Sequence, residues 1–399
     1  MRLNRRTFCS GAAAAVLADV YLPIARALPA RIHESAAYRM VAETDHQRIL
    51  KAAHEYLPLT VLTITAFSSD KSPGGQHDFF SQADYFWPDP KNPDGPYVNR
   101  DGQSNPDNFN KHREVMINLS VRMPALTAAW LLTGDAKYAK RAGDYLRAWF
   151  VTSATRMNPN LEFSQGVHGV STGRSYGIID TLHLAEVARA ASFLNSVALD
   201  EDDLREIKEW FRQYLAWMKT SEKGEKERAA LNNHATCWAF QASEFARLIE
   251  DEGTRDEMRK WFAQTLLPDQ LGADGSFPQE LVRTKPYSYS IFNFDVMAGL
   301  AQSLKGSVPD LTKFSLPDGR GLCKAVAFLY PYLKDKSKWP YKKDVEHFDS
   351  LPIRSPGLLF AGLACDREEY IALWKTLDPD PQNREIIRNF PIRQPLLWV

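Results

Sequence analysis

The sequence predicts an all-α protein, an (α/α) barrel or toroid of antiparallel helix pairs with long irregular loops over the cleft. Two observations favour this fold class. Apolar residues recur at helical spacing in one segment after another, and the segments pair at intervals of roughly 40 to 60 residues. No stretch shows the alternation of apolar and polar residues that half-buried strands require. The 399 residues, 44% of them hydrophobic, are enough to bury a core.

The clearest helix pair follows residue 111. Residues 112–133 carry apolar side chains at helical spacing, and a second helix runs through Tyr138 to Phe150. Between them, Gly134 suits the left-handed residue that ends a helix, and Asp135 suits the cap that begins the next one. Further helices are expected at 178–195, 201–219, 233–250, 254–266, 289–304, 319–333 and 366–376.

Two segments depart from the helical pattern. Residues 1–27 have the pattern of a twin-arginine export signal, with Arg5-Arg6, a short apolar stretch and an Ala-Arg-Ala cleavage site. Residues 66–110 are rich in Pro, Gly, Asp and Asn and are expected to form a long loop or lid. Its aromatic side chains favour order, and we select Tyr85 and Trp87 as substrate-binding residues, since sugar rings stack on flat aromatic faces.

Residues 28–399 are expected to form one toroid domain that is periplasmic, or secreted, after export. Lys plus Arg and Asp plus Glu each total 49, and this balance argues against a nucleic-acid partner. No second apolar run of membrane length is expected, so no membrane partner is predicted. The protein is expected to be a monomer or a small homo-oligomer.

Metal and cysteine chemistry are not predicted. No His, Cys, Asp or Glu cluster has the spacing of metal ligands, so neither a metal nor a cofactor is expected. Cys237, Cys323 and Cys365 are expected to be buried small hydrophobic residues. Proteins exported by the twin-arginine route fold in a reducing compartment, so no disulfide is expected.

Three polar clusters carry the candidate functional side chains. The first is Asn232-Asn233-His234 at the start of an apolar helix, where one of the asparagines can cap the helix. His234 then lies in the first helical turn. The positive end of the helix dipole favours a neutral imidazole there, and a neutral imidazole can accept a proton.

The second cluster ends at a predicted helix start and brings together Arg283, Lys285, Tyr287 and Tyr289. We expect that these side chains are not all buried. A neighbouring cation lowers the pKa of a tyrosine and makes it usable as an acid or a base. Tyr289 is the first choice for that role, and Tyr287 is the alternative.

The third cluster runs from Asn158 to Asp180 and contains four glycines, which allow the backbone to approach a ligand closely. Gln165, His168 and Arg174 can present polar groups to that ligand. The alternative interpretation is a glycine-rich connection between helices.

Together these residue types match the requirements of β-elimination on a uronate. The reaction removes the C5 proton of a sugar whose C5 carries a carboxylate, and it expels the glycosyl oxygen from C4. The carboxylate has to be neutralised, and Asn233 and Arg283 suit that task. A base and an acid are also needed. His234 or His168 suits the base, and Tyr289 suits the base, the acid or both.

These motifs resemble those of the alginate lyase superfamily, which includes polysaccharide lyase families 5 and 38. The resemblance extends from about Tyr85 to Leu300. It is carried by Asn232-Asn233-His234, by the run from Asn158 to Gln165 that leads to residues 173–181, and by Arg283 followed by Tyr289.

The resemblance implies a helical toroid in which Asn233 and Arg283 hold the substrate carboxylate while His234 and Tyr289 move the protons. The interval from Arg283 to Tyr289 is one residue shorter than expected for family 5, and the loop at residues 87–90 is more similar to family 38. The resemblance therefore implies an acidic polysaccharide as substrate, with alginate ahead of glucuronan.

Two other functions fit part of the pattern. A glycoside hydrolase on an (α/α) barrel needs two carboxylates at the scissile bond, and Asp180, Glu280 and Asp295 are the candidates. A non-catalytic glycan-binding protein of the same fold would keep the aromatic residues and Arg283 and would have no use for Tyr289 beside a histidine.

Overall fold

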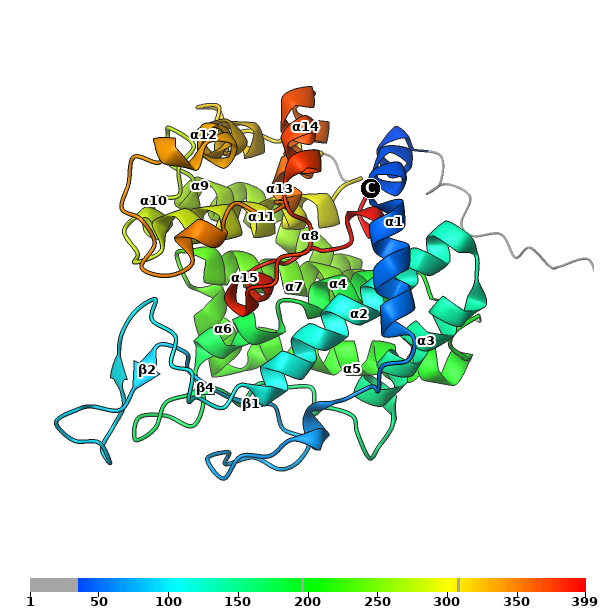
Figure 1. Cartoon of the computed structure of the whole chain (residues 1–399), viewed down its shortest axis with the longest axis vertical. Helices are drawn as coiled ribbons and strands as arrows, with labels where there is room; N and C mark the ends of the chain where they lie inside the picture. Colours follow the sequence, from blue (N-terminus) through cyan, green and yellow to red (C-terminus); the bar gives the residue numbers. More distant parts are fainter. Residues whose placement is uncertain (1–34, 195–196, 307–308) are drawn as a thin grey trace, which may run out of the picture.

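The computed structural model describes residues 35–194, 197–306 and 309–399 (Figure 1). The export signal expected at residues 1–27 lies outside this part of the chain. The helices are α1 (Ala36–Tyr56), α2 (Lys111–Thr133), α3 (Ala136–Leu146), α4 (Leu184–Ala191), α5 (Glu201–Thr220), α6 (Glu222–Arg228), α7 (Asn233–Ile249), α8 (Glu252–Trp261), α9 (Leu267–Gln270), α10 (Pro278–Leu281), α11 (Pro286–Ser303), α12 (Leu322–Lys334), α13 (Pro356–Ala364), α14 (Glu368–Thr376) and α15 (Arg384–Arg388).

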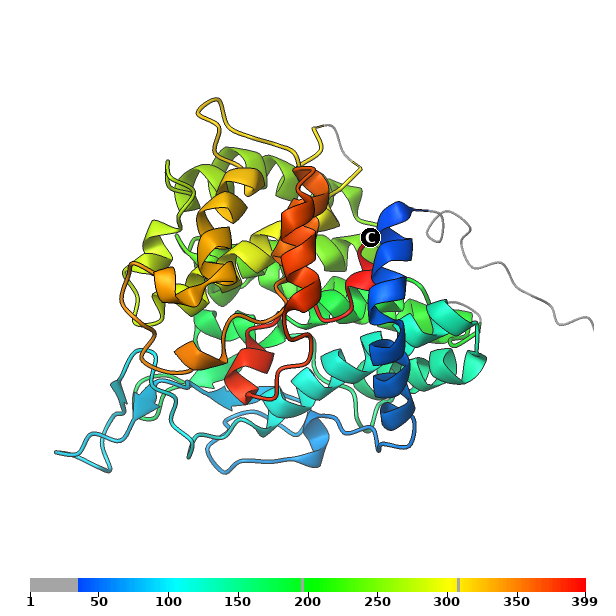
Figure 2. The same ribbon diagram turned by 45° about the horizontal axis from the view of Figure 1, so that its top comes forward.

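The helices form an inner and an outer layer. Helices α2, α4, α7, α11 and α13 pack against one another in that order, and every residue of α4 and α11 is buried. Helices α1, α3, α5, α8, α12 and α14 each pack on a helix of the inner layer (Figure 2). The sequence predicts antiparallel pairs of helices, and the structure pairs inner helices with outer ones. The all-α prediction is confirmed.

Several predicted helix ends are also confirmed. Gly134 has a φ of 70° and ends α2, and the Asp135 side chain accepts a hydrogen bond from the Lys137 backbone N–H at the start of α3. The helix expected at 178–195 is shorter, because a 3-10 segment, Ser175–Thr181, precedes α4. Six helices lie outside the predicted ranges: α1, α6, α9, α10, α13 and α15.

The 66–110 segment is less irregular than expected. It contains β1 (Phe80–Gln82), β2 (Phe86–Trp87) and β3 (Val98–Asn99). β1 pairs in parallel with β4 (Phe163–Gly166), and β2 pairs antiparallel with β3. The hairpin of β2 and β3 projects from one end of the molecule (Figures 1 and 2). These strands have two to four residues, too few for an alternating pattern to identify them in the sequence.

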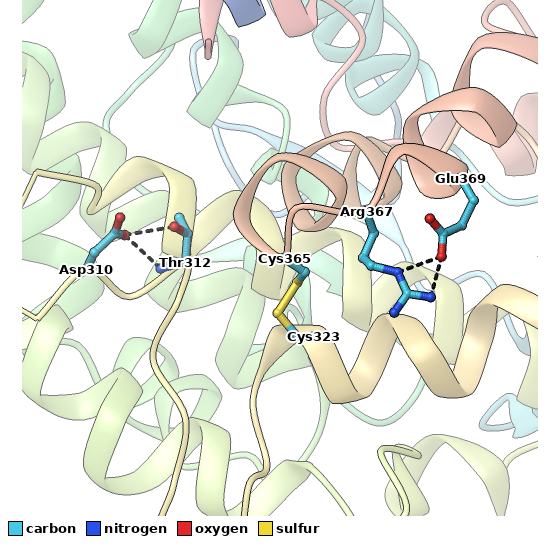
Figure 3. Close-up of a disulfide and its surroundings, with 6 residues drawn as sticks. All are labelled: Asp310, Thr312, Cys323, Cys365, Arg367 and Glu369. Atoms are coloured by element: carbon cyan, nitrogen blue, oxygen red, sulfur yellow. Dashed lines mark hydrogen bonds and ion pairs between the residues drawn. A yellow bond between two sulfur atoms is a disulfide. The ribbon is translucent and has the colours of Figure 1, made fainter.

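The absence of a disulfide was a wrong prediction. Cys323, at the start of α12, bonds to Cys365, at the end of α13, with their Cα atoms 5.8 Å apart (Figure 3). The two residues are 42 positions apart and meet only because α12 packs on α13. Cys237 is free and buried, as expected.

Helix α2 also corrects an expectation. Its 23 residues are long and apolar enough to span a membrane, although no such run was expected. Of its most apolar window, 72% is buried inside the fold. The outer helices α1 and α3 and the inner helix α4 pack on it, and this explains its composition, since a helix surrounded by protein can be apolar on every face.

Candidate active site

A cavity of about 380 Å³ opens where α7 and α11 begin, a size typical of small-molecule sites. The positive ends of two helix dipoles lie at its wall, and this favours an anionic ligand. The cavity is lined by Asp84, Tyr85, Phe86, Asn99, Asp101, Gln165, Arg174, Tyr176, Ile179, Asn232, Asn233, His234, Arg283, Tyr289, Phe292, Arg388 and Asn389.

Tyr289 lies in the first turn of α11 and is only 7% exposed. Its hydroxyl is 2.9 Å from the hydroxyl of Tyr85. Burial raises the pKa of Tyr289 above its ordinary value, although the charge of Arg283 lowers it. The expectation of a net lowering was therefore wrong, because desolvation of the phenolate outweighs the cation. Tyr289 thus holds its proton at neutral pH.

His234 is held in place by a carboxylate that the sequence analysis did not select. Its Nδ1 lies 2.5 Å from Oε1 of Glu227, which is buried at the end of α6. A carboxylate accepts hydrogen bonds, so Nδ1 carries the proton and Nε2 is left as an acceptor. The ring of Tyr176 meets the imidazole edge-on, 4.9 Å away.

Asn233 is fixed by a second buried carboxylate. Both Glu280 carboxylate oxygens accept from the Asn233 amide nitrogen at 2.9 Å, and Oε1 also accepts from the Asn233 backbone N–H. Burial raises the pKa of Glu280, although these hydrogen bonds lower it. Asn232 takes the capping role: its side chain accepts from the His234 backbone N–H.

Arg283 faces the cavity from the turn before α11. Its guanidinium lies 4.7 Å from the centre of the Tyr289 ring and donates to Asp101 at 2.9 Å. Thr284 also donates to Asp101, from its hydroxyl. The cation therefore already holds one carboxylate, which comes from the 66–110 segment.

Gln165 and Arg174 form the opposite wall. Gln165 adopts a left-handed backbone conformation with φ of 51°, which is uncommon for a residue with a side chain. Its amide nitrogen donates to Asp180, and its side-chain oxygen accepts from Arg174 at 2.9 Å. The Arg174 guanidinium lies over the rings of Phe86 and Tyr176 at 4.8 and 5.2 Å.

The C-terminal segment completes the wall with Arg388 and Asn389. Arg388 is 2.6 Å from Asp84, which also forms an ion pair with the buried Arg113. Burial raises the pKa of Asp84, but the two arginines outweigh it and lower the pKa to about 2. Asp84 is therefore ionised at neutral pH and fixes α15 against the 66–110 segment.

Four of the predicted site residues do not line this cavity. His168 lies on another surface groove with Lys71 and packs against Tyr97, so the structure leaves His234 as the histidine beside Tyr289. Trp87 turns away and donates its indole N–H to the Gln103 carbonyl.

The other two belong to the interior. Tyr287 is fully buried and donates to the Tyr332 carbonyl, in an aromatic cluster with Trp339. Lys285 is 1% exposed and pairs with Glu346 and Glu385. The expectation that these four side chains are not all buried is met by Arg283 alone, the only one of the four whose side chain is more than a tenth exposed.

The carboxylates weighed for a hydrolase are engaged inside the protein. Asp180 accepts from Ser81 and Gln165, and Glu280 holds Asn233. Asp295 lies where α11 meets α13 and accepts from Ser355 and from the Gly357 backbone N–H. None of the three lines the cavity. Within the described ranges, no group of three or more His, Cys, Asp or Glu side chains is placed to hold a metal ion.

Comparison with known proteins gives the family. Residues 63–339 match the family model described as alginate lyase. The chain belongs to the alginate lyase family. It is a polysaccharide lyase, and the predicted family and toroid fold are confirmed. This lyase is 30% identical to an alginate lyase from Bacteroides ovatus, whose crystal structure aligns over 92% of this chain and 98% of that chain with a TM-score of 0.77.

Two further structures share the fold with this lyase at 14% identity. One is a histidine-to-alanine variant of alginate lyase A1-III complexed with a tetrasaccharide, covering 88% of this chain and 94% of that chain with a TM-score of 0.55. The other is a tyrosine-to-phenylalanine variant in the same kind of complex, covering 91% and 93% with a TM-score of 0.54. No curated protein matches the lyase.

Proposed function

We propose that this lyase cleaves a uronate-containing polymer by β-elimination and releases unsaturated oligosaccharides. Alginate, in its polymannuronate form, is the favoured substrate, and glucuronan is the next. The observation that carries the proposal is that Asn233, His234, Arg283 and Tyr289 line one cavity. The name of the Bacteroides ovatus relative supports the choice of alginate.

The substrate carboxylate is neutralised by Arg283. Asn233 assists by a hydrogen bond, and to donate it the amide nitrogen has to give up one of its two Glu280 contacts. The positive ends of the α7 and α11 dipoles add to their effect. Asp101 occupies Arg283 in the free enzyme, so the substrate carboxylate displaces it or shares the guanidinium with it. We therefore also propose that residues 66–110 form a lid, because this segment brings Asp101 and Tyr85 to the cavity.

The proton transfers are divided between His234 and Tyr289. Glu227 orients the imidazole so that Nε2 accepts the C5 proton. The electron pair of the broken C–H bond forms the C4–C5 double bond, and the C4–O bond breaks. Tyr289 still holds its proton at neutral pH and donates it to the departing oxygen. The imidazolium and the phenolate then exchange a proton, directly or through solvent, and both groups return to their starting states.

An assay on three polymers tests this function. The enzyme is incubated with polymannuronate, polyguluronate and glucuronan, and the ultraviolet absorbance of the unsaturated uronate product is followed. We expect absorbance to rise fastest on polymannuronate. New reducing ends without this absorbance would indicate a hydrolase, and binding without either signal would indicate a glycan-binding protein.

We further propose that the mature protein acts in the periplasm or outside the cell. The Arg5-Arg6 pattern supports export, and the Cys323–Cys365 bond supports an oxidising compartment. Cell fractionation tests this. Arg5→Lys combined with Arg6→Lys should retain the protein in the cytoplasm, and unchanged export would contradict the proposed route.

A further inference from the structure

A second groove adjoins the cavity. Arg174 and Tyr176 line both, so the two hollows meet at these side chains. The groove has a volume of about 540 Å³, larger than the cavity itself. Its walls come from the loop after β4 and from the start of α6, the helix that also carries Glu227.

The groove contains a cation without a protein partner. Lys226 is exposed, and its side chain makes no hydrogen bond or ion pair with any other residue that the structure describes. Its neighbour Lys223 lies 2.5 Å from Glu162, which also accepts from the Trp217 indole at 2.7 Å. Burial raises the pKa of Glu162, but these two contacts outweigh it and lower the pKa. Glu162 is thus already paired, and Lys226 remains available to an anion.

The junction of the two hollows suits a sugar ring. Tyr176 is 45% exposed, so much of its ring is accessible to a ligand. Arg174 and His234 hold its ring from two sides, at 5.2 and 4.9 Å. An aromatic face fixed in this way is a platform on which the C–H face of a sugar can stack.

We propose that this groove binds uronate residues that adjoin the cleaved one along the polymer. Tyr176 stacks a sugar, and Lys226 binds the carboxylate of a neighbouring residue of the polymer. The inference rests on the proposed function and adds to it a requirement for the substrate: the chain has to carry carboxylates beyond the cleavage site. A polymer with isolated uronates among neutral sugars would not use the groove.

Charge changes in the groove test this proposal. Lys226→Gln should raise the KM for long polyuronates about threefold, the effect expected for one solvent-exposed charge pair, and leave kcat within about twofold. The rise should grow with oligosaccharide length and shrink at high salt, because exposed charges are screened. Glu222→Gln removes an acidic side chain from the same groove and should lower the KM.

Lys140→Gln is the matched control, because Lys140 is an exposed lysine on α3, outside the groove. An unchanged KM in Lys226→Gln and in the double variant Lys223→Gln/Lys226→Gln would contradict the proposal that the groove binds uronates. The proposed function would not be affected. An increase that is equal for all chain lengths would contradict the groove proposal as well. A wild-type enzyme that fails to cleave polyuronates would overturn the proposed function and the groove together.

Discussion

At the scale of single residues, Tyr289 is the most direct test of the proposed chemistry. Its hydroxyl is the donor for the leaving oxygen, so Tyr289→Phe should lower kcat by about 10²- to 10⁴-fold while polymer binding is retained. Product absorbance and equilibrium binding measure the two effects separately. Tyr287→Phe is the control, since this hydroxyl contacts only the core carbonyl of Tyr332. A Tyr289→Phe variant with wild-type kcat would contradict the assignment.

Glu227 is a positioning residue, and its effect should appear in kcat. Without its carboxylate the imidazole of His234 loses the partner that fixes its tautomer. We expect Glu227→Ala to lower kcat about 10- to 100-fold, with a much smaller change in KM. Glu227→Gln, whose side-chain oxygen can still accept from Nδ1, should recover part of the loss. Equal values for both variants and the wild type would exclude this role.

The residues of the cavity differ in how far the sequence reveals them. Asn233 and His234 are recognisable because a capping pattern precedes an apolar helix. Tyr289 is placed ahead of Tyr287 by the family resemblance and not by a local pattern. The two are two residues apart, which corresponds to roughly 200° of rotation and so to opposite faces of the helix. Which face meets the cavity depends on packing. Glu227 lies in a charged segment, a pattern typical of a solvent-exposed helix. It contacts His234 only because the turn between α6 and α7 brings the two helices together.

At the scale of secondary-structure elements, the disulfide that joins α12 to α13 should contribute measurably to the free energy of unfolding. Closing a loop of 42 residues restricts the unfolded chain, so replacing both cysteines by serine should lower the free energy of unfolding by about 4 kcal/mol. Urea denaturation measures this. Activity before denaturation should persist, because neither cysteine lines the cavity. A reductant should destabilise the wild type and have no such effect on the double variant.

Helices α6 and α13, which were not predicted, lack the amphipathic pattern that identifies α3 and α5 in the sequence. Helix α13 is apolar almost throughout, because protein surrounds it, and it therefore has no helical periodicity. Helix α6 is charged at six of seven positions and has two buried residues. In both cases tertiary packing stabilises the helix, and the hydrophobic pattern within the segment does not predict that packing.

At the scale of the whole molecule, the packing of α11 on α13 should make stability depend on pH. Burial raises the pKa of Asp295 to about 7 from 3.8. The unfolded chain releases this proton above about pH 4 and the folded chain above about pH 7, so stability falls as the pH rises between these values. The loss is on the order of 4 kcal/mol.

Asp295→Asn removes this titration while keeping an oxygen that can accept from Ser355 and Gly357. Its free energy of unfolding should therefore change much less than that of the wild type between about pH 5 and about pH 8. Asp349→Asn, at a fully exposed carboxylate, is the control. Parallel pH profiles for the wild type and Asp295→Asn would show that Asp295 does not contribute this dependence.

The ion pair of Asp84 with Arg388 has a consequence for biosynthesis. The two walls of the cavity that it joins are separated by most of the chain, so a ribosome-bound nascent chain lacks one of them until α15 has emerged. The cavity is therefore complete only after α15 has been synthesised and has folded against the 66–110 segment. Any proteolytic trimming that removes α15 should likewise abolish activity, although residues 63–339, which define the family, would be intact.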